Sequence, residues 1–257
     1  MEKVQNHAIT KLDLIKIMHR SFYIQAVWNF ERLQNLGFLF TVVPMINRLY
    51  KKGPARIEAL HRNLEFFNTH PYMASFVVGV TTSLEEKMVN QPGTVKPEDI
   101  RSIKAIMSGP LAAIGDAFFW ASLRPFSALI GILMILTLEG NGKLIGPVFF
   151  LLFFNFFGLY IRFGGIAKGY ILGTGVVEIL KKFDTQDLIT VINLLGMIGL
   201  GVLIMLYAVN LNMWQNIVFF GTLLMMYGLI RKKINTNILI YGVLALGVLL
   251  YYLKVIL

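Results

Sequence analysis

Long apolar runs without charged side chains in the second half of the chain constrain its fold most strongly. Residues 188–211 and 214–230 contain no charged residue, and residues 238–257 contain only Lys254. An apolar helix of about 20 residues crosses the roughly 30 Å hydrocarbon layer of a bilayer. A soluble domain could not hide several such helices behind a charged surface, so we expect these three segments to be transmembrane helices.

Two further apolar runs are shorter or interrupted. Residues 145–161 are rich in Phe and are interrupted only by Asn155, which predicts a fourth span. Residues 126–138 lie between Pro125 and Glu139 and are too short for an ordinary span. They predict either a short, tilted span or a half-helix that enters the membrane.

Composition supports a membrane protein. Of the 257 residues, 56% are hydrophobic and 15% charged, whereas soluble domains carry about a quarter charged residues. The net charge of +10 fits cytoplasmic loops that face anionic lipid, because most basic residues flank apolar runs. We expect no nucleic-acid binding. The chain has no cysteine, which excludes disulfides and thiolate metal sites, and we expect no metal and no cofactor.

Basic residues predict the orientation of the second half. Two clusters flank the hairpin formed by 188–211 and 214–230, and they consist of Lys168, Lys181 and Lys182, and of Arg231, Lys232 and Lys233. Cytoplasmic loops of membrane proteins are enriched in Lys and Arg, which places both clusters in the cytoplasm. The last helix then ends outside, and the loop around Glu139 also lies outside.

The first half is more charged and more interrupted, and we divide the chain at residues 1–125 and 126–257. Residues 12–24 have the spacing of an amphipathic helix that lies in the interface or against a partner. Residues 46–66 are charged and predict a cytosolic helical hairpin with Gly53-Pro54 as its turn. Residues 72–84 and 103–123 are short or are broken by Gly and Pro, as at transporter binding sites. The predicted class is an all-α integral membrane protein with amphipathic N-terminal helices, broken or re-entrant hydrophobic helices, and C-terminal transmembrane helices.

Polar side chains within apolar segments are costly and therefore are candidate functional residues. The richest group consists of Gln25, Asn29, Glu31, Arg32 and Gln34. If this stretch is helical, Gln25 and Asn29 share one face. Amides and carboxylates bind adjacent sugar hydroxyls while an aromatic ring covers the sugar's CH face, and Trp28 or Phe30 could supply that ring. The alternative is a structural ion pair of Glu31 with Arg32 that holds two helices together.

Asp116 lies deep in the apolar run 103–123, where a lone carboxylate is costly. It could bind a sugar, cap a helix at a re-entrant break, or pair with Lys104 or Arg124. The three roles stay open from the residues alone.

Other conspicuous residues favour structural roles. His70 precedes Pro71, and we interpret it as a turn or cap residue with Asn68 and Thr69, although Asn68 and His70 stay among the candidate substrate-binding residues. Glu85 and Glu86 are interpreted as the end of a helix at the membrane surface. No nucleophile–base pair or phosphate-binding loop is visible, so we expect no catalytic residue. The closely spaced glycines at 164–175 favour close helix packing.

Three long motifs, at 25–38, 64–72 and 103–120, closely resemble the IID membrane component of mannose-family phosphotransferase systems. Residues 123–125 continue the third motif, and residues 229–233 resemble the family's C-terminal end. The resemblance covers nearly the whole chain. This chain differs from the family at residues 211–213, which join two helices directly. Family members usually carry a polar segment of some tens of residues among the last three helices.

The resemblance implies a multi-pass protein of the bacterial cytoplasmic membrane. A IID subunit pairs with a IIC subunit to bind and translocate a hexose or amino sugar, and several such pairs form a higher oligomer. Cytosolic IIA and IIB components relay phosphate from phosphoenolpyruvate to the sugar, and IID itself carries no phosphorylation site.

These inferences select one set of candidate substrate-binding residues: Gln25, Trp28, Asn29, Glu31, Arg32, Gln34, Asn68, His70 and Asp116. The alternative function is a membrane scaffold that stabilises IIC without contacting sugar. An autonomous secondary transporter is a further alternative, which would move unphosphorylated sugar on its own.

Overall fold

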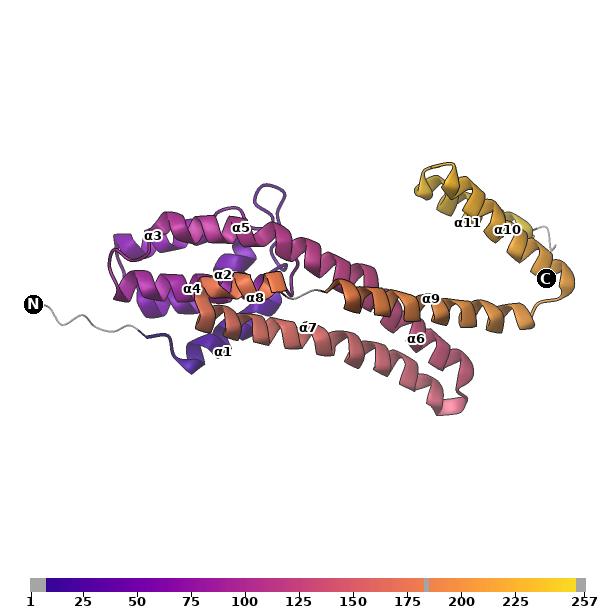
Figure 1. Ribbon diagram of the computed structural model, residues 1–257, viewed down its shortest axis with the longest axis horizontal. Coiled ribbons are helices and arrows are strands. Elements are labelled where there is room, and N and C mark those ends of the chain that lie inside the picture. Colours follow the sequence, from indigo (N-terminus) through magenta and orange to yellow (C-terminus); the bar gives the residue numbers. More distant parts are fainter. Residues whose placement is uncertain (1–7, 183–184, 253–257) are drawn as a thin grey trace, which may run out of the picture. The chain divides into compact units, whose positions relative to one another are not determined.

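The computed structural model describes residues 8–182 and 185–252 (Figure 1). Within these residues the chain is helical, and its only β-type pairings are isolated bridges at Leu33 with Asn29 and with Phe67. The predicted all-α membrane class is confirmed. The chain divides into two compact units, Met1–Met197 and Ile198–Leu257, and each is described by itself.

The first unit contains most of the helices. They are α1 (Lys11–Arg20), α2 (Asn35–Leu49), α3 (Pro54–Asn63), α4 (Ala74–Asn90), α5 (Pro97–Gly115), the π-helical η2 (Asp116–Leu123), α6 (Arg124–Thr137), α7 (Ile145–Leu172), α8 (Val176–Lys182) and the beginning of α9 (Gln186–Val209). Short 3₁₀ turns are η1 (Ser21–Tyr23), η3 (Gly140–Leu144) and η4 (Gly173–Gly175). The second unit contains the end of α9, then α10 (Met213–Arg231) and α11 (Thr236–Tyr252).

Local sequence explains where the N-terminal helices begin. Thr10 and Asp13 form a reciprocal capping box that starts α1. Gly53 adopts a φ of 146°, which favours glycine, and Pro54 occupies the first turn of α3. The turn expected at Gly53-Pro54 is therefore present, and α1 is the expected amphipathic helix.

Among the described residues, four helical segments are long and apolar enough to cross a membrane: Pro97–Thr137, Gly140–Glu178, Gln186–Val209 and Met213–Arg231. The segment Pro97–Thr137 differs from what the sequence predicts. Pro110 does not interrupt its helix, and residues 126–138 are not a separate half-helix, because α5, η2 and α6 form one continuous helical segment (Figure 1). Where the sequence predicts breaks within residues 103–123, the structure instead has the π-helical stretch η2.

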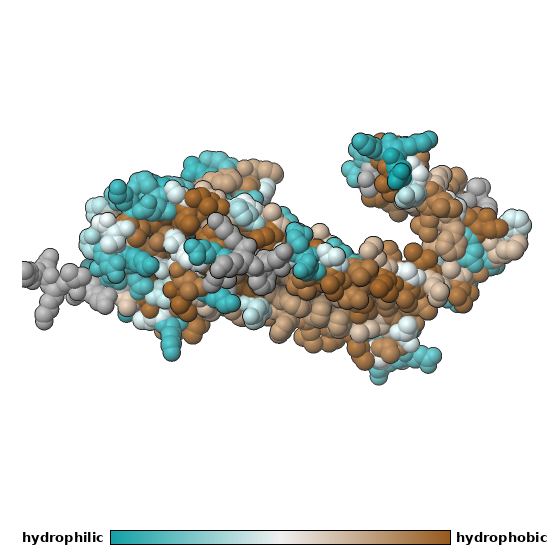
Figure 2. Space-filling view, viewed as in Figure 1, coloured by the Kyte–Doolittle hydropathy of each residue, from teal (hydrophilic) through white to brown (hydrophobic). Residues whose placement is uncertain are grey.

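Figure 2 shows hydrophobic side chains over α6 and α7 and hydrophilic ones around α3. Exposed apolar residues on α7 include Leu151, Leu152 and Phe156. Such a surface needs lipid or a partner as its surroundings. It agrees with the multi-pass membrane location expected from the sequence.

Helices α4 and α7 pack at very short range through glycines. A Cβ added to Gly169 would lie 2.6 Å from the Phe76 carbonyl oxygen, and one added to Gly165 would overlap the Ser75 hydroxyl. Small residues let helix backbones approach in this way in membranes. The packing role that the sequence favours is confirmed for these two glycines, whereas a Cβ at Gly164 would meet no atom within 4 Å.

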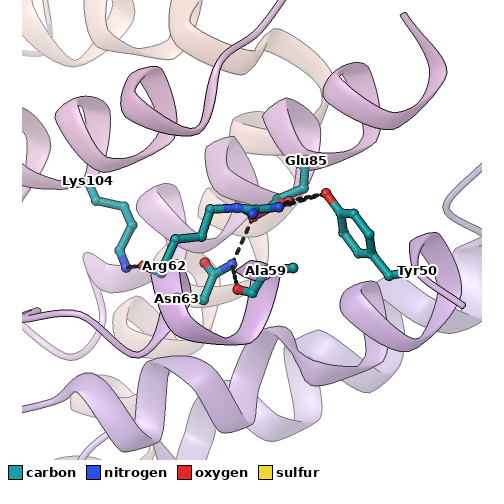
Figure 3. Close-up of polar contacts among 6 residues, drawn as sticks. All are labelled: Tyr50, Ala59, Arg62, Asn63, Glu85 and Lys104. Carbon is teal, nitrogen blue, oxygen red and sulfur yellow. Dashed lines mark hydrogen bonds and ion pairs between the residues drawn. The ribbon is translucent and has the colours of Figure 1, made fainter. Parts of the chain in front are cut away.

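A buried polar network joins α2, α3, α4 and α5 (Figure 3). The Glu85 carboxylate is fully buried and accepts hydrogen bonds from Arg62 (Nε, 2.7 Å; Nη2, 2.5 Å), from the Tyr50 hydroxyl (2.6 Å) and from Asn63 (2.8 Å). Lys104 donates to the Arg62 carbonyl oxygen at 3.2 Å. Helix α4 continues to Asn90, so Glu85 does not mark the end of a helix as expected, and its carboxylate lies inside the protein.

Contact with Glu85 fixes the protonation of Tyr50 and Arg62. Burial and the adjacent Glu85 carboxylate raise the pKa of Tyr50, so its hydroxyl stays protonated and donates. Burial by itself would lower the pKa of Arg62, but the hydrogen bonds and charge of Glu85 outweigh it and the pKa is raised. We therefore expect Tyr50 to stay protonated and Arg62 to stay charged near neutral pH.

Gly165→Ala should destabilise the protein, because its methyl group overlaps Ser75 across the α4–α7 contact. Overpacking of this kind costs about 1–3 kcal/mol, which a thermal melt in detergent would detect. Gly164→Ala is the matched control, since its methyl group meets open space. Equal melting temperatures for the two variants would contradict the packing described here.

Glu85→Ala should destabilise the protein by about 3–5 kcal/mol, because it leaves the buried Arg62 guanidinium without its counter-ion. Glu58→Ala removes an exposed carboxylate from α3 and serves as control. The readout is the melting temperature together with the yield of folded protein. A decrease in melting temperature no larger than that of Glu58→Ala would show that Glu85 is not essential to the network.

Candidate functional site

The segment that carries the richest group of predicted site residues is a structured loop and not a helix. The backbones of Asn29 and Leu33 exchange hydrogen bonds at 3.1 and 3.0 Å, and Leu33 has a φ of 54°. The expected sharing of a helix face by Gln25 and Asn29 therefore does not occur. A left-handed Leu is uncommon, and here the bridges to Asn29 and Phe67 hold it in place.

Two of the predicted residues use their side chains to build this loop. The Asn29 amide donates to Asn35 Oδ1 at 2.8 Å, and its oxygen accepts from the Arg32 N–H at 2.8 Å. The buried Gln34 amide exchanges two hydrogen bonds with the backbone of Thr69, at 2.8 and 3.1 Å. These bonds fasten the loop to the segment before α4.

The tip of the loop presents the remaining predicted residues on the surface. Phe30 is 92% exposed and Trp28 46% exposed, and their ring centroids lie 4.9 Å apart. Glu31 and Arg32 form an exposed ion pair at 3.2 Å. This pair joins two adjacent residues of one loop. It therefore does not hold two helices together, as the alternative interpretation required.

His70 is buried in an aromatic cluster under η2, whereas its neighbour Asn68 is exposed. Its ring stacks on Phe119 at 5.0 Å and lies 5.0 Å from the Trp120 ring centroid. Nδ1 accepts a hydrogen bond from the Tyr72 N–H at 3.4 Å, and Nε2 is buried without a partner among the described residues. Burial, and to a lesser extent the charge of Arg162, lower the pKa of His70 to about 4. The structure thus shows His70 as a neutral residue in the turn before α4, which agrees with its interpretation from the sequence as a turn residue.

Asp116 begins the π-helical stretch η2 and points outward. The backbone is helical on both sides of it, so it does not cap a helix, and Lys104 is instead bound to Arg62. Within residues 8–182 and 185–252, its carboxylate has no hydrogen bond or ion pair, with Arg124 or any other group. Of the three roles that the sequence left open for Asp116, the described residues show neither helix capping nor pairing within the chain.

Asp116 shares its exposed face with an aromatic residue. Trp120 lies one turn further along η2, is 37% exposed, and has the Arg124 guanidinium 5.5 Å from its ring centroid. π-Helical turns are rare and occur frequently at functional sites. A free carboxylate, an indole and a guanidinium therefore lie in succession on one helix.

The loop and η2 are linked through the segment before α4. Thr69, which is bonded to Gln34, also donates from its hydroxyl to the Ser108 carbonyl oxygen of α5 at 2.8 Å. Ser108 precedes Asp116 by about 12 Å along the helix. The base of the loop is thus anchored two turns before the free carboxylate.

Arg162 is a buried charged residue whose role was not predicted from the sequence. It is buried in α7, donates to the Ser21 carbonyl oxygen at the end of α1, and lies 4.8 Å from the Phe22 ring and 5.2 Å from the Tyr72 ring. Its place at the end of the Phe-rich run 145–161 could have identified it. It fastens the amphipathic N-terminal helix to a membrane helix.

The arrangement can bind polar molecules. The described residues include no group of three or more His, Asp or Glu side chains that could hold a metal ion. The exposed polar groups are suited to hydroxyl-rich ligands or to a protein partner.

Residues 8–220 match the family model of the mannose/fructose/sorbose-family IID component of phosphotransferase systems. The chain belongs to this family. The mannose-specific EIID component of Escherichia coli K12 is 37% identical over 81% of this chain and 70% of its own length. The fructose permease IID component of Bacillus subtilis is 30% identical over 98% of both chains.

A solved structure agrees with this assignment. The complex of the mannose transporter ManYZ with microcin E492 contains a chain that is 32% identical, with a TM-score of 0.61. The match covers 95% of this chain and 97% of the other. The IID component described here is thus a multi-pass membrane protein of the mannose-family phosphotransferase system.

Acidification should destabilise this IID component partly through His70. The unfolded residue accepts a proton near pH 6.5 and the folded one only near pH 4, so the stability present above pH 6.5 is lost as the pH falls toward 4. The shift corresponds to about 3 kcal/mol. Melting temperatures measured between pH 7 and pH 4 should fall less steeply for His70→Gln than for the wild type.

His61→Gln, at an exposed position on α3, is the control and should keep the wild-type pH dependence. If the melting temperatures of the wild type and of His70→Gln fall equally with pH, the result would contradict a buried, neutral His70.

Proposed function

We propose that this IID component binds and translocates a hexose or amino sugar together with a IIC membrane partner, and that the cytosolic IIB component then phosphorylates the sugar. The observation that supports this most is the unpaired carboxylate of Asp116 beside the exposed ring of Trp120 on a membrane helix. Family membership supports the same function.

A free carboxylate on a membrane helix needs a polar environment. Asp116 lies near the middle of Pro97–Thr137, which is long and apolar enough to span the bilayer. Within the hydrocarbon layer a charged side chain that faces lipid costs several kcal/mol, so charged residues of membrane helices face protein or a water-filled path. The face that carries Asp116 therefore meets the partner, the sugar, or both.

The chemistry of this face suits a sugar. A carboxylate can accept hydrogen bonds from two adjacent hydroxyl groups, and an indole can cover the apolar CH face of the ring. Asp116 and Trp120 are one helical turn apart and both are exposed. In this proposal Asp116 accepts from the sugar, Trp120 stacks against it, and His70 supports the Trp120 ring from below.

The loop supplies a second group of candidate contacts. Gln25, Trp28, Glu31 and Arg32 are exposed at or beside its tip, while Asn29 and Gln34 hold its shape. We assign the exposed residues to contacts with the sugar or with the moving surface of the partner, and Asn29 and Gln34 to positioning.

A scaffold without sugar contacts is the second candidate. Its support is that Asn29, Gln34 and His70 are engaged within this chain. In that case Asp116 would pair with a donor of the partner, and mutation would impair assembly before transport. Assembly and uptake measured side by side distinguish the two functions.

The remaining partners follow from the proposed role. Phosphate would pass through the cytosolic IIA and IIB components, so this chain needs no catalytic residue of its own. We also propose that several IIC–IID pairs assemble into a higher oligomer in the cytoplasmic membrane.

Asp116→Asn should lower the affinity for sugar about 10- to 100-fold, because hydrogen bonds to a charged group contribute about 1.5–3 kcal/mol. The measurement is uptake of radiolabelled hexoses and amino sugars by cells that express the complete system. Glu139→Gln, in the exposed turn before α7, is the control and should transport normally.

Co-purification of the partner subunit must accompany each assay. Normal uptake by both Asp116→Asn and Trp120→Ala, with the complex intact, would remove the sugar contact and leave the scaffold function. Loss of the complex in Asp116→Asn would likewise favour the scaffold.

A further inference from the structure

An apolar cavity of about 290 Å³ in the first unit opens between α4, η2 and α7, and Leu180, Thr185 and Leu188 also line it. Its walls are almost entirely aromatic and aliphatic, with Phe118 and Phe119 of η2 on one side and Phe156, Phe157 and Ile161 of α7 on the other. The site proposed for sugar lies on the exposed face of η2 and does not include this cavity.

The cavity runs along α7 for about one leaflet of a bilayer. From Phe156 to Lys168 the helix rises by about 18 Å, and half of the hydrocarbon layer measures about 15 Å. Lys168 lies near the end of α7 that the distribution of basic residues places in the cytoplasm. The apolar walls therefore lie at the depth of acyl chains, and Lys168 lies at the depth of the headgroups.

Lys168 is the only charged residue of the cavity lining that the structure describes. It is exposed, and among residues 8–182 and 185–252 its ammonium group has no hydrogen bond or ion pair. Thr185 contributes a hydroxyl group to the same lining. Basic pockets between membrane helices on the cytoplasmic side are known to bind lipid phosphate groups.

We propose that this cavity is a binding site for one anionic phospholipid of the cytoplasmic leaflet. An acyl chain fills the space between η2 and α7, and the headgroup phosphate contacts Lys168. A sugar or a free phosphate ion does not suit the apolar walls, because burying their polar groups without hydrogen bonds is costly. The acyl chain would contact Phe119, which stacks on His70, so the lipid would support the helix face that carries Asp116.

Photo-crosslinking tests this directly. The full chain, purified with its partner subunit, is placed in phosphatidylcholine nanodiscs with a trace of phosphatidylglycerol or phosphatidylcholine that carries a diazirine on one acyl chain. Peptide mapping by mass spectrometry then measures labelling around 156–161. One lysine near a lipid surface contributes about 1 kcal/mol, which predicts about a fivefold excess of labelling by the phosphatidylglycerol probe.

Three variants identify the headgroup contact. Lys168→Gln should reduce labelling by phosphatidylglycerol to the level of phosphatidylcholine, while Lys168→Arg should keep the excess. Lys143→Gln, in η3 before the other end of α7, is the control and should also keep it.

Two results would overturn the proposal. Equal labelling by the two probes in the wild type would show that the headgroup is not recognised. Absence of labelling at 156–161, with labelling elsewhere on the complex, would show that a protein segment covers the cavity. Neither result affects the sugar proposal, which uptake by Asp116→Asn tests separately.

Discussion

Close contact between α4 and α7 is the interaction on which the first unit depends. Gly165 and Gly169 bring the α7 backbone against Ser75 and Phe76 of α4, and dispersion and close packing, not the hydrophobic effect, hold helices together in lipid. The contact positions the segment before α4, where Thr69 holds both the loop and α5, and where His70 lies beneath Trp120. Arg162 then fastens α1 to the same helix pair.

Two charged sites in this protein have opposite surroundings. Glu85 and Arg62 are buried and fully engaged, and they stabilise the fold. Asp116 is exposed and has no hydrogen bond or ion pair among the described residues, and it lies between the apolar residues of α5 and η2. Asp116, unlike Glu85 and Arg62, has unused capacity for a ligand, and this is why we assign sugar binding to η2 and not to the network in Figure 3.

Features encoded by local composition were predictable from the sequence. Apolar length predicted helices α7, α9 and α10, and Gly53-Pro54 predicted the turn before α3. Features that depend on distant contacts were not. The loop at 24–34 is held by Thr69 and Phe67, and Glu85 finds Arg62 23 residues away. The shift from α- to π-helical bonding at Asp116 has no local signature, so the sequence predicted a break there and could not decide among the roles of the carboxylate.

The chain contains no cysteine, so the surroundings of residue 116 can be measured with a single introduced thiol. Asp116→Cys is assembled with its partner, with the wild-type chain as background, and is treated with a charged, water-soluble thiol reagent with and without the transported sugar. The account predicts modification of the thiol and a clear slowing by sugar. A thiol that never reacts, or that reacts at the same rate with sugar present, would contradict the claim that Asp116 faces a hydrophilic path for the sugar.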